Sequence, residues 1–200
     1  MSKKDKTKRK SERADGQKRR FTPLTELPSF SKEDDDGLYN IVIETPKGSP
    51  NKLAYDPDLG AFKLKAVLPE GSNFPFDFGF IPSTLADDGD PLDVLVLMDH
   101  PLVPGSIVPS RLIGVIDGKQ TERDGDTEEN DRLIAVSPES ATYQKTKNIS
   151  DLPRELVEQV EQFFINYNDQ RGKKFVPKGQ HGPKRAEDRV DQARKNFRKR

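Results

Sequence analysis

The stretch DGDPLDVLVL, residues 88–97, joins an acidic turn to an apolar run of strand length. Asp88 and Asp90 can project together, because alternate side chains of extended backbone share a face. Pro91 stiffens the chain, so Asp93 can join the pair from the first turn of the strand. Three carboxylates held this close repel one another unless they are protonated or bound to metal. A plain surface turn is the alternative, but a third Asp entering an apolar strand favours a site for Mg²⁺ or Mn²⁺.

Similar apolar runs occur on both sides of this stretch. They are LYNIVIE (38–44), AFKLKAV (61–67), FPFDFGF (74–80), SRLIGVI (110–116) and RLIAV (132–136). Apolar residues alternate along several of them, as in half-buried strands, and Pro, Gly and charged clusters separate them. Many short strands with turns between them favour a closed or partly closed barrel.

Two helices are expected near the end of the chain. In residues 151–167 apolar side chains recur at helical spacing. Ser150 or Asp151 can cap the start of this helix, and Gly172 lies just beyond its end. Residues 184–199 repeat the spacing more weakly. Strands followed by helices in one chain indicate an α+β fold.

Charge is divided unevenly along a chain of 200 residues with no formal net charge. Residues 1–20 hold ten Lys/Arg and three Asp/Glu, and residues 183–200 hold eight and three, so the part between is acidic. Residues 1–20 have almost no apolar side chains, so we predict that they are disordered. We divide the chain into a basic extension with its linker (1–37), one domain (38–182) and a basic C-terminal helix (183–200).

Composition excludes several classes of protein. The sequence contains no run of about 18 apolar residues, so we expect no transmembrane helix and no membrane partner. The basic N-terminus lacks the apolar region of a secretory signal, and we expect a cytoplasmic protein. Without cysteine, thiol chemistry is excluded and metal ligands must be oxygen or histidine. An acidic body disfavours nucleic acid, although the basic ends leave nucleic-acid or polyphosphate binding as an alternative.

Further charged residues are candidates for the site that the Asp cluster predicts. The loop from Glu122 to Asp131 could complete a two-metal site, although alone it is typical of a solvated hairpin loop. Phosphate also needs cations, and Lys52, Lys65 and Arg132 could hold the oxygens that metals leave free. Each of these cations, taken alone, is typical of a surface charge.

The residues from about Leu38 to Lys178 resemble the family I soluble inorganic pyrophosphatases. The block DGDPLDVLVL followed by P-L-x-P-G-S carries the resemblance, with the ordered series VIE-x-P, FGFI, GVI, RLIAV and FF-x-x-Y. The resemblance implies an α+β fold, built as an OB-like five-stranded β-barrel with flanking C-terminal helices. It also implies hydrolysis of pyrophosphate to two phosphates with several Mg²⁺ ions, in a homo-oligomer.

The resemblance also implies roles for individual residues. Asp90 matches the acceptor of the proton from the attacking water, and Glu44 matches an active-site carboxylate outside the metal ligands. The implied metal ligands are Asp88, Asp90, Asp93, Glu122 and Asp131 or its neighbour Asn130. The implied phosphate-binding residues are Lys52, Arg132 and Tyr167, to which we add Lys65.

Several positions depart from the family pattern. Tyrosines are replaced by Phe74 and Phe78, a lysine by Asn168, a glutamate by Ala54 and an arginine by Ala66. Lys65 is adjacent to Ala66 but would face the other way on a regular strand. Each loss removes a hydrogen bond or a charge, so a relaxed hydrolase of longer or organic pyrophosphates is a second hypothesis. An inactive OB-like module that binds polyanions is a third.

Overall fold

The computed structural model describes residues 22–31 and 37–199. Its strands are β1 (Tyr39–Thr45), β2 (Asn51–Asp56), β3 (Ala61–Val67), β4 (Asp77–Phe80), β5 (Asp93–Leu97), β6 (Ile107–Thr121), β7 (Thr127–Glu129), β8 (Arg132–Val136) and β9 (Lys174–His181). Its helices are α1 (Arg154–Asp169) and α2 (Pro183–Phe197), with short 3₁₀ turns η1 (Leu24–Glu26) and η2 (Ile149–Asp151). No helix in these two ranges is long and apolar enough to span a bilayer. The disorder predicted for residues 1–20 lies outside the described residues.

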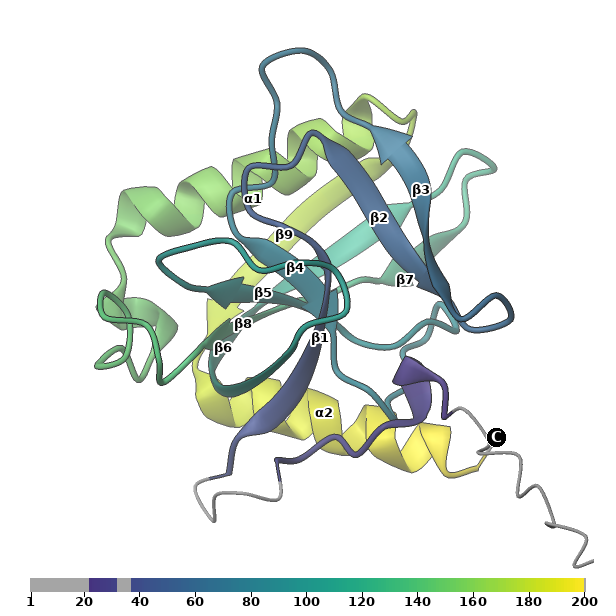
Figure 1. Ribbon diagram of the computed structural model, residues 1–200. Helices are drawn as coiled ribbons and strands as arrows, with labels where there is room; N and C mark the ends of the chain where they lie inside the picture. Colours follow the sequence, from purple (N-terminus) through teal and green to yellow (C-terminus); the bar gives the residue numbers. More distant parts are fainter. Residues whose placement is uncertain (1–21, 32–36, 200) are drawn as a thin grey trace, which may run out of the picture.

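Five strands close into a barrel, as the sequence predicts. The sheet runs β1-β4-β5-β8-β6, and β6 returns to pair with β1 (Figure 1). The 15-residue β6 is long enough to pair with β1 near its start and with β9 towards its end. Only the β5–β8 pair is parallel among the pairs of this ring. The predicted OB-like α+β fold is therefore confirmed.

The helices cover the barrel on two sides (Figure 1). Successive residues of β5 enter different core clusters, with Val94 and Val96 in one and Leu95 and Leu97 in the other. A strand buried on both faces has no polar face, which explains the continuous apolar run VLVL. The first cluster includes α2 through Ala186, Val190 and Ala193, and the second includes α1 through Val157, Val160 and Phe164.

The start of α1 differs from the prediction. Asp151 belongs to η2, where its side chain and that of Asn148 form a reciprocal capping box. Helix α1 begins only at Arg154, and its N-cap Pro153 makes no side-chain capping bond. A residue that precedes proline avoids helical backbone, and Leu152 is indeed extended, with ψ of 150°. Capping by Ser150 or Asp151 is therefore a wrong prediction for α1.

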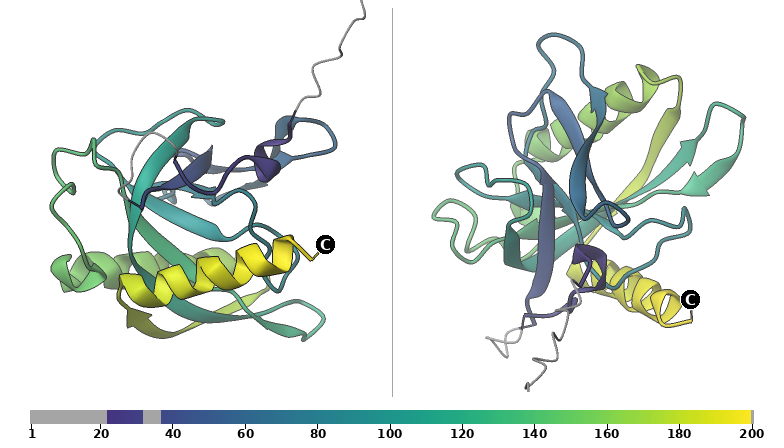
Figure 2. Two further views of the ribbon diagram at one scale, coloured as in Figure 1. Left: turned by 90° about the horizontal axis from the view of Figure 1, so that it is seen from below. Right: turned by 45° about the vertical axis from the view of Figure 1, so that its right-hand side comes forward.

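Residues 22–31 pack against the barrel, although the sequence predicts a linker there. Ser29 Oγ donates a 2.7 Å hydrogen bond to the Pro82 carbonyl, and the Phe30 ring lies 4.8 Å from that of Tyr39. The Arg194 guanidinium of α2 lies 4.4 Å from the centre of the Phe30 ring, where the segment runs towards α2 (Figure 2). Isolated apolar anchors between prolines give no periodic pattern, so this docking leaves no clear signal in the sequence.

Candidate active site

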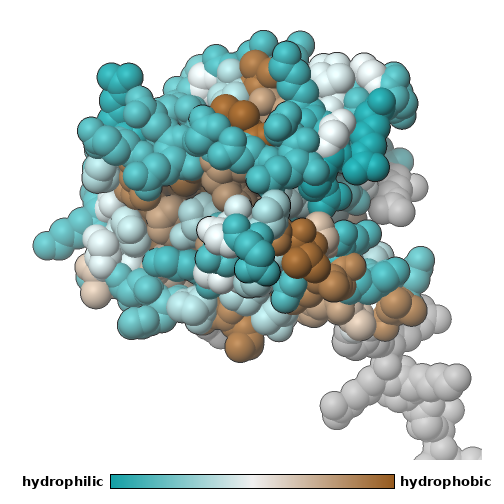
Figure 3. Space-filling model, turned by 90° about the horizontal axis from the view of Figure 1, so that it is seen from above, coloured by the Kyte–Doolittle hydropathy of each residue, from teal (hydrophilic) through white to brown (hydrophobic). Residues whose placement is uncertain are grey.

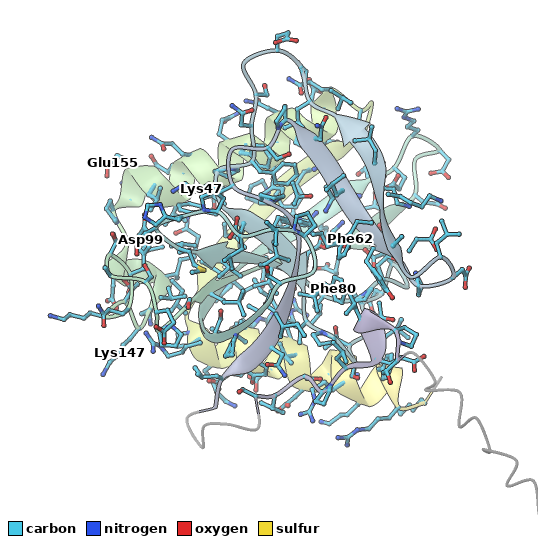
Figure 4. The ribbon with its side chains drawn as sticks, in the orientation of Figure 1. Lys47, Phe62, Phe80, Asp99, Lys147 and Glu155 are labelled. Atoms are coloured by element: carbon cyan, nitrogen blue, oxygen red, sulfur yellow. The ribbon has the colours of Figure 1, made fainter. Side chains whose placement is uncertain are left out.

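A cavity of about 500 Å³ opens at one end of the barrel. Its lining comes from the β2–β3 hairpin, the turn before β5, the β6–β7 region and the end of α1. It includes the predicted residues Glu44, Lys52, Lys65, Asp88, Asp90, Asp93, Glu122, Arg132 and Tyr167. Aromatic residues form part of its floor, among them Phe80, which Figure 4 labels on β4. The fold therefore brings together side chains from most of the chain's length.

The acidic wall of this cavity consists of Asp88, Asp90 and Asp93. The backbone N–H of Asp90 donates to Asp88 Oδ1 at 3.0 Å, and the Ala86 N–H donates to the Asp90 carbonyl at 2.8 Å. Asp93 begins β5 and pairs with Arg132 at 2.8 Å. The turn is thus held by backbone groups of Asp90 and Ala86 and by the Asp88 side chain, and the Asp90 side chain makes none of these bonds and lines the cavity.

The acidic wall is electrostatically suited to a cation. Partial desolvation, followed by repulsion from Asp93, Asp90 and Glu128, raises the pKa of Asp88 to about 6. A proton or a metal ion relieves this repulsion. Metal affinity should therefore depend on pH in the mildly acidic range.

We expect divalent-metal binding to weaken as the pH falls below about 6. Folding raises the pKa of Asp88, so the folded protein holds this proton more tightly and a metal ligand must release it. Mn²⁺ titrations followed by electron paramagnetic resonance, from about pH 7 to about pH 5, measure the effect. Asp88→Asn should bind more weakly but with a flatter pH dependence. An equally steep dependence in this variant would assign the proton to another group.

Glu44 and Lys52 form a buried ion pair beside the acidic wall. Ile43 pairs with Gly79 and Thr45 with Phe78, so Glu44 is the extra residue of a β-bulge in β1. Its Oε2 lies 3.3 Å from Lys52 Nζ, and its Oε1 accepts a 2.7 Å hydrogen bond from a backbone N–H of β2. Burial raises the pKa of Glu44 and lowers that of Lys52, because each loses water. Bulges commonly redirect a side chain beside an active site, and this one directs Glu44.

A second set of cavity residues, the basic wall, consists of Arg132, which contacts the acidic wall through Asp93, and of Arg171 and Lys173. Arg132 is buried, and its guanidinium lies over the rings of Phe164 and Phe175 at 4.9 and 5.5 Å. Arg171 Nη1 donates to the Tyr167 hydroxyl at 2.8 Å, and all three cations line the cavity. The cavity therefore holds both carboxylates and cations, an arrangement that suits a metal–phosphate complex.

Asp131 does not line this cavity. Its Oδ1 accepts a hydrogen bond from Gly118 N–H at 3.1 Å, and its Oδ2 pairs with Arg189 of α2 at 2.7 Å. The neighbouring Asn130 lines the cavity instead and accepts a hydrogen bond from Arg132. The two residues form the link between β7 and β8, and of the two only Asn130 lines the cavity.

A family model described as inorganic pyrophosphatase matches residues 41–198. The chain belongs to the inorganic pyrophosphatase family. It is 42% identical to the inorganic pyrophosphatase of Thermus thermophilus over 151 residues, covering 76% of this chain and 82% of that protein. The crystal structure titled as that organism's enzyme has a TM-score of 0.78, with 88% of this chain and 99% of that chain covered at 37% identity. The Synechocystis inorganic pyrophosphatase is 40% identical over 149 residues, 73% of this chain and 82% of that protein.

Phe74 and Phe78 stand where the pyrophosphatase family pattern has tyrosines, and both line the cavity. Lys52 Nζ lies 3.7 Å from the centre of the Phe78 ring and 5.8 Å from that of Phe74. An aromatic ring face attracts a cation, so the two phenylalanines hold Lys52 although they supply no hydroxyl. Asn168 is buried, and its amide donates to the Phe164 carbonyl at 2.9 Å. It caps its own helix where the family pattern has a lysine.

Lys65 enters the cavity through a second bulge. Lys52 pairs with Ala66 and Leu53 with Leu64, so Lys65 is an extra residue in β3. The expectation that Lys65 and Ala66 face opposite ways assumes a regular strand, and the bulge removes that regularity. Lys65, and not Ala66, lines the cavity.

The cavity is also lined by Gln120, Arg171 and Lys173, which the sequence analysis did not predict. Gln120 is a buried polar residue near the end of β6, and its strand position could have marked it as functional. Arg171 and Lys173 follow α1, where basic residues are common for reasons of helix capping alone. They lie far from the acidic wall in the sequence, so the sequence alone does not indicate that they line the same cavity.

Proposed function

We propose that this chain hydrolyses inorganic pyrophosphate to two phosphates in the cavity between the acidic wall and the basic wall. One observation carries the proposal: in an inorganic pyrophosphatase family member, three carboxylates and three cations line one cavity. Pyrophosphate is a compact, multiply charged anion, and it needs charge neutralisation at both phosphoryl groups. Carboxylates alone would repel it.

Divalent metal ions fit the acidic wall. Its oxygen donors suit Mg²⁺, which we propose as the metal, with Mn²⁺ as a substitute. Within residues 22–31 and 37–199, no three acidic or histidine side chains converge as a ready-made metal site. Mg²⁺ in proteins is commonly held by one or two carboxylates together with water and substrate phosphate oxygens. Bound there, the metal would neutralise substrate charge and lower the pKa of a coordinated water.

The side chains of this chain would divide the remaining work. Asp90 would accept the proton of the attacking water as the water oxygen bonds to phosphorus and the bridging P–O bond breaks. The electron pair of that bond leaves with the departing phosphate. Lys52, Lys65 and Arg132, with the Tyr167 hydroxyl, would hold the non-bridging phosphate oxygens. Glu44 would keep the Lys52 ammonium in place through their ion pair.

We expect purified protein to release phosphate from pyrophosphate with Mg²⁺ and to release none with excess chelator. A metal ion bound at the acidic wall would supply the positive charge that keeps the carboxylates from repelling pyrophosphate. A colorimetric phosphate assay measures the release, and restoring Mg²⁺ after chelation is the control for irreversible damage. Release that survives chelation would contradict the metal role, and no release in either condition would favour the polyanion-binding module.

A relaxed hydrolase is a second candidate, favoured by the alanines in the site. Ala54 lines the cavity where a glutamate is the family pattern, and the cavity of about 500 Å³ leaves room around a small anion. Turnover of tripolyphosphate and nucleoside triphosphates, compared with pyrophosphate, tests this candidate. A strong preference for pyrophosphate would exclude it.

We further propose that the protein is cytoplasmic and forms a homo-oligomer. We also propose that the chain divides into a basic extension with its linker (1–37), one domain (38–182) and a basic C-terminal helix (183–200). The family resemblance supports this assembly. Large apolar side chains also remain exposed on a mostly hydrophilic surface (Figure 3), namely Leu59, Leu64, Val67, Val103 and Ile107. Sedimentation equilibrium would measure the oligomeric state.

A further inference from the structure

Glu122 is already neutralised by a cation of the chain. Lys173 Nζ lies 2.7 Å from its Oε1 and 2.5 Å from its Oε2. The Gln120 amide donates to the same Oε1 at 2.6 Å. Both carboxylate oxygens of Glu122 therefore already have a partner, and the group that contacts both is the Lys173 ammonium.

The surroundings of Glu122 disfavour a second cation. The cavity-lining side chains that act on Glu122 are the neutral amide of Gln120 and the cations Lys173 and Arg171. Asn130, which also lines the cavity, is a neutral amide and is held by Arg132. Glu128, the other carboxylate of the loop region in the cavity, acts electrostatically on Asp88 and so belongs to the acidic side. A divalent ion at Glu122 would meet one carboxylate and two positive charges.

We propose that Lys173, held by Glu122, forms with Arg171 a subsite for a phosphoryl group, and that Glu122 binds no metal ion. The inference rests on the proposed pyrophosphatase activity and deepens it. Metal ions would be confined to the acidic wall, and side-chain cations would bind the phosphoryl group at the far end of the cavity.

The geometry supports a binding role for Lys173 rather than a purely structural one. Its side chain is 24% exposed and that of Glu122 is 28% exposed, so the pair is open to the cavity and not sealed in the core. An ammonium has three N–H donors, and Glu122 uses only part of this capacity. Arg171 likewise spends one N–H on Tyr167 and has others free to face an anion. Charge-assisted bonds to phosphate oxygens are among the strongest hydrogen bonds in proteins.

The first experiment counts metal ions. Mn²⁺ titrations followed by electron paramagnetic resonance would compare wild-type protein with Glu122→Gln, in the presence of inorganic phosphate. The expected stoichiometry is the same for both, whereas Asp93→Asn should lose Mn²⁺. A Glu122→Gln variant that loses one Mn²⁺ per chain would overturn the inference, even if the wild-type protein still hydrolyses pyrophosphate.

The second experiment measures phosphate affinity by calorimetry in Mg²⁺. Lys173→Gln should weaken inorganic phosphate binding about tenfold, and Lys173→Arg should retain most of the affinity because it keeps the charge. Lys174→Gln is the matched control, since Lys174 is exposed and does not line the cavity. Unchanged affinity in Lys173→Gln would overturn the subsite. Wild-type protein that binds neither Mn²⁺ nor phosphate would overturn the proposed function as well.

Discussion

Asp90→Asn should reduce phosphate release from pyrophosphate by a factor of about 10² to 10⁴, the range that general base catalysis contributes. The substitution keeps the size of the side chain but replaces a carboxylate by an amide. An amide cannot accept the proton of the attacking water at neutral pH, and it is a weaker ligand for Mg²⁺. Initial rates at saturating Mg²⁺ measure the loss.

The fold should tolerate this change. Asp90 is exposed, and the turn that carries it is held by backbone atoms: its own N–H bonds to Asp88, and its carbonyl accepts from Ala86. Removing one charge from the acidic wall also relieves repulsion on Asp88. Thermal unfolding of metal-free Asp90→Asn should therefore occur at or slightly above the wild-type temperature.

Asp87→Asn is the matched control for Asp90→Asn. It removes one negative charge from the same turn, but Asp87 does not line the catalytic cavity; it lines a small neighbouring pocket towards α2, which shares Asp88 and Asp93 with that cavity. Its activity should stay within a factor of about two of wild type, since a surface charge change is weakly felt across solvent. Turnover by Asp90→Asn close to that of Asp87→Asn would remove the proton-accepting role from Asp90.

The sequence predicted what depends on local pattern. The apolar runs gave the barrel strands, because side-chain alternation and turn residues act over a few positions. The acidic wall was also predictable, since Asp88, Asp90 and Asp93 lie on one short turn and are brought together by the chain itself. These features need no knowledge of which strands are neighbours.

The missed features all depend on strand pairing or on distant contacts. The bulges at Glu44 and Lys65 follow from register against neighbouring strands, which alternation along one strand cannot reveal. Asp131 and Asn130 are adjacent in the link between β7 and β8, and only the folded structure shows which of them lines the cavity. Lys173 reaches Glu122 across 51 positions of sequence, through the pairing of β9 with β6. Local composition could not place this ion pair.

Gly79→Ala should destabilise the protein by about 3 kcal/mol or more, the upper end of the cost of overpacking. A β-carbon on Gly79 would lie 1.9 Å from the Val42 carbonyl oxygen and 2.8 Å from its carbon. These are backbone atoms of β1, so no side-chain rotation can relieve the clash. The strands β1 and β4 would have to separate, and Ile43, which pairs with Gly79 next to the bulge, would move.

Gly179→Ala on β9 is the matched control, because its new β-carbon would meet only the flexible His181 side chain, at 3.3 Å. Its stability should stay within about 1 kcal/mol of wild type, as expected for Gly to Ala without strain. Urea unfolding followed by circular dichroism compares the two variants. Since domain stabilities are about 5–15 kcal/mol, we expect Gly79→Ala to be recovered folded, so that its residual activity can be measured. Displacement of the Glu44 bulge would loosen Lys52, so turnover should fall although Gly79 lines no part of the cavity. Wild-type stability and turnover in Gly79→Ala would show that the β1–β4 pairing does not position Glu44.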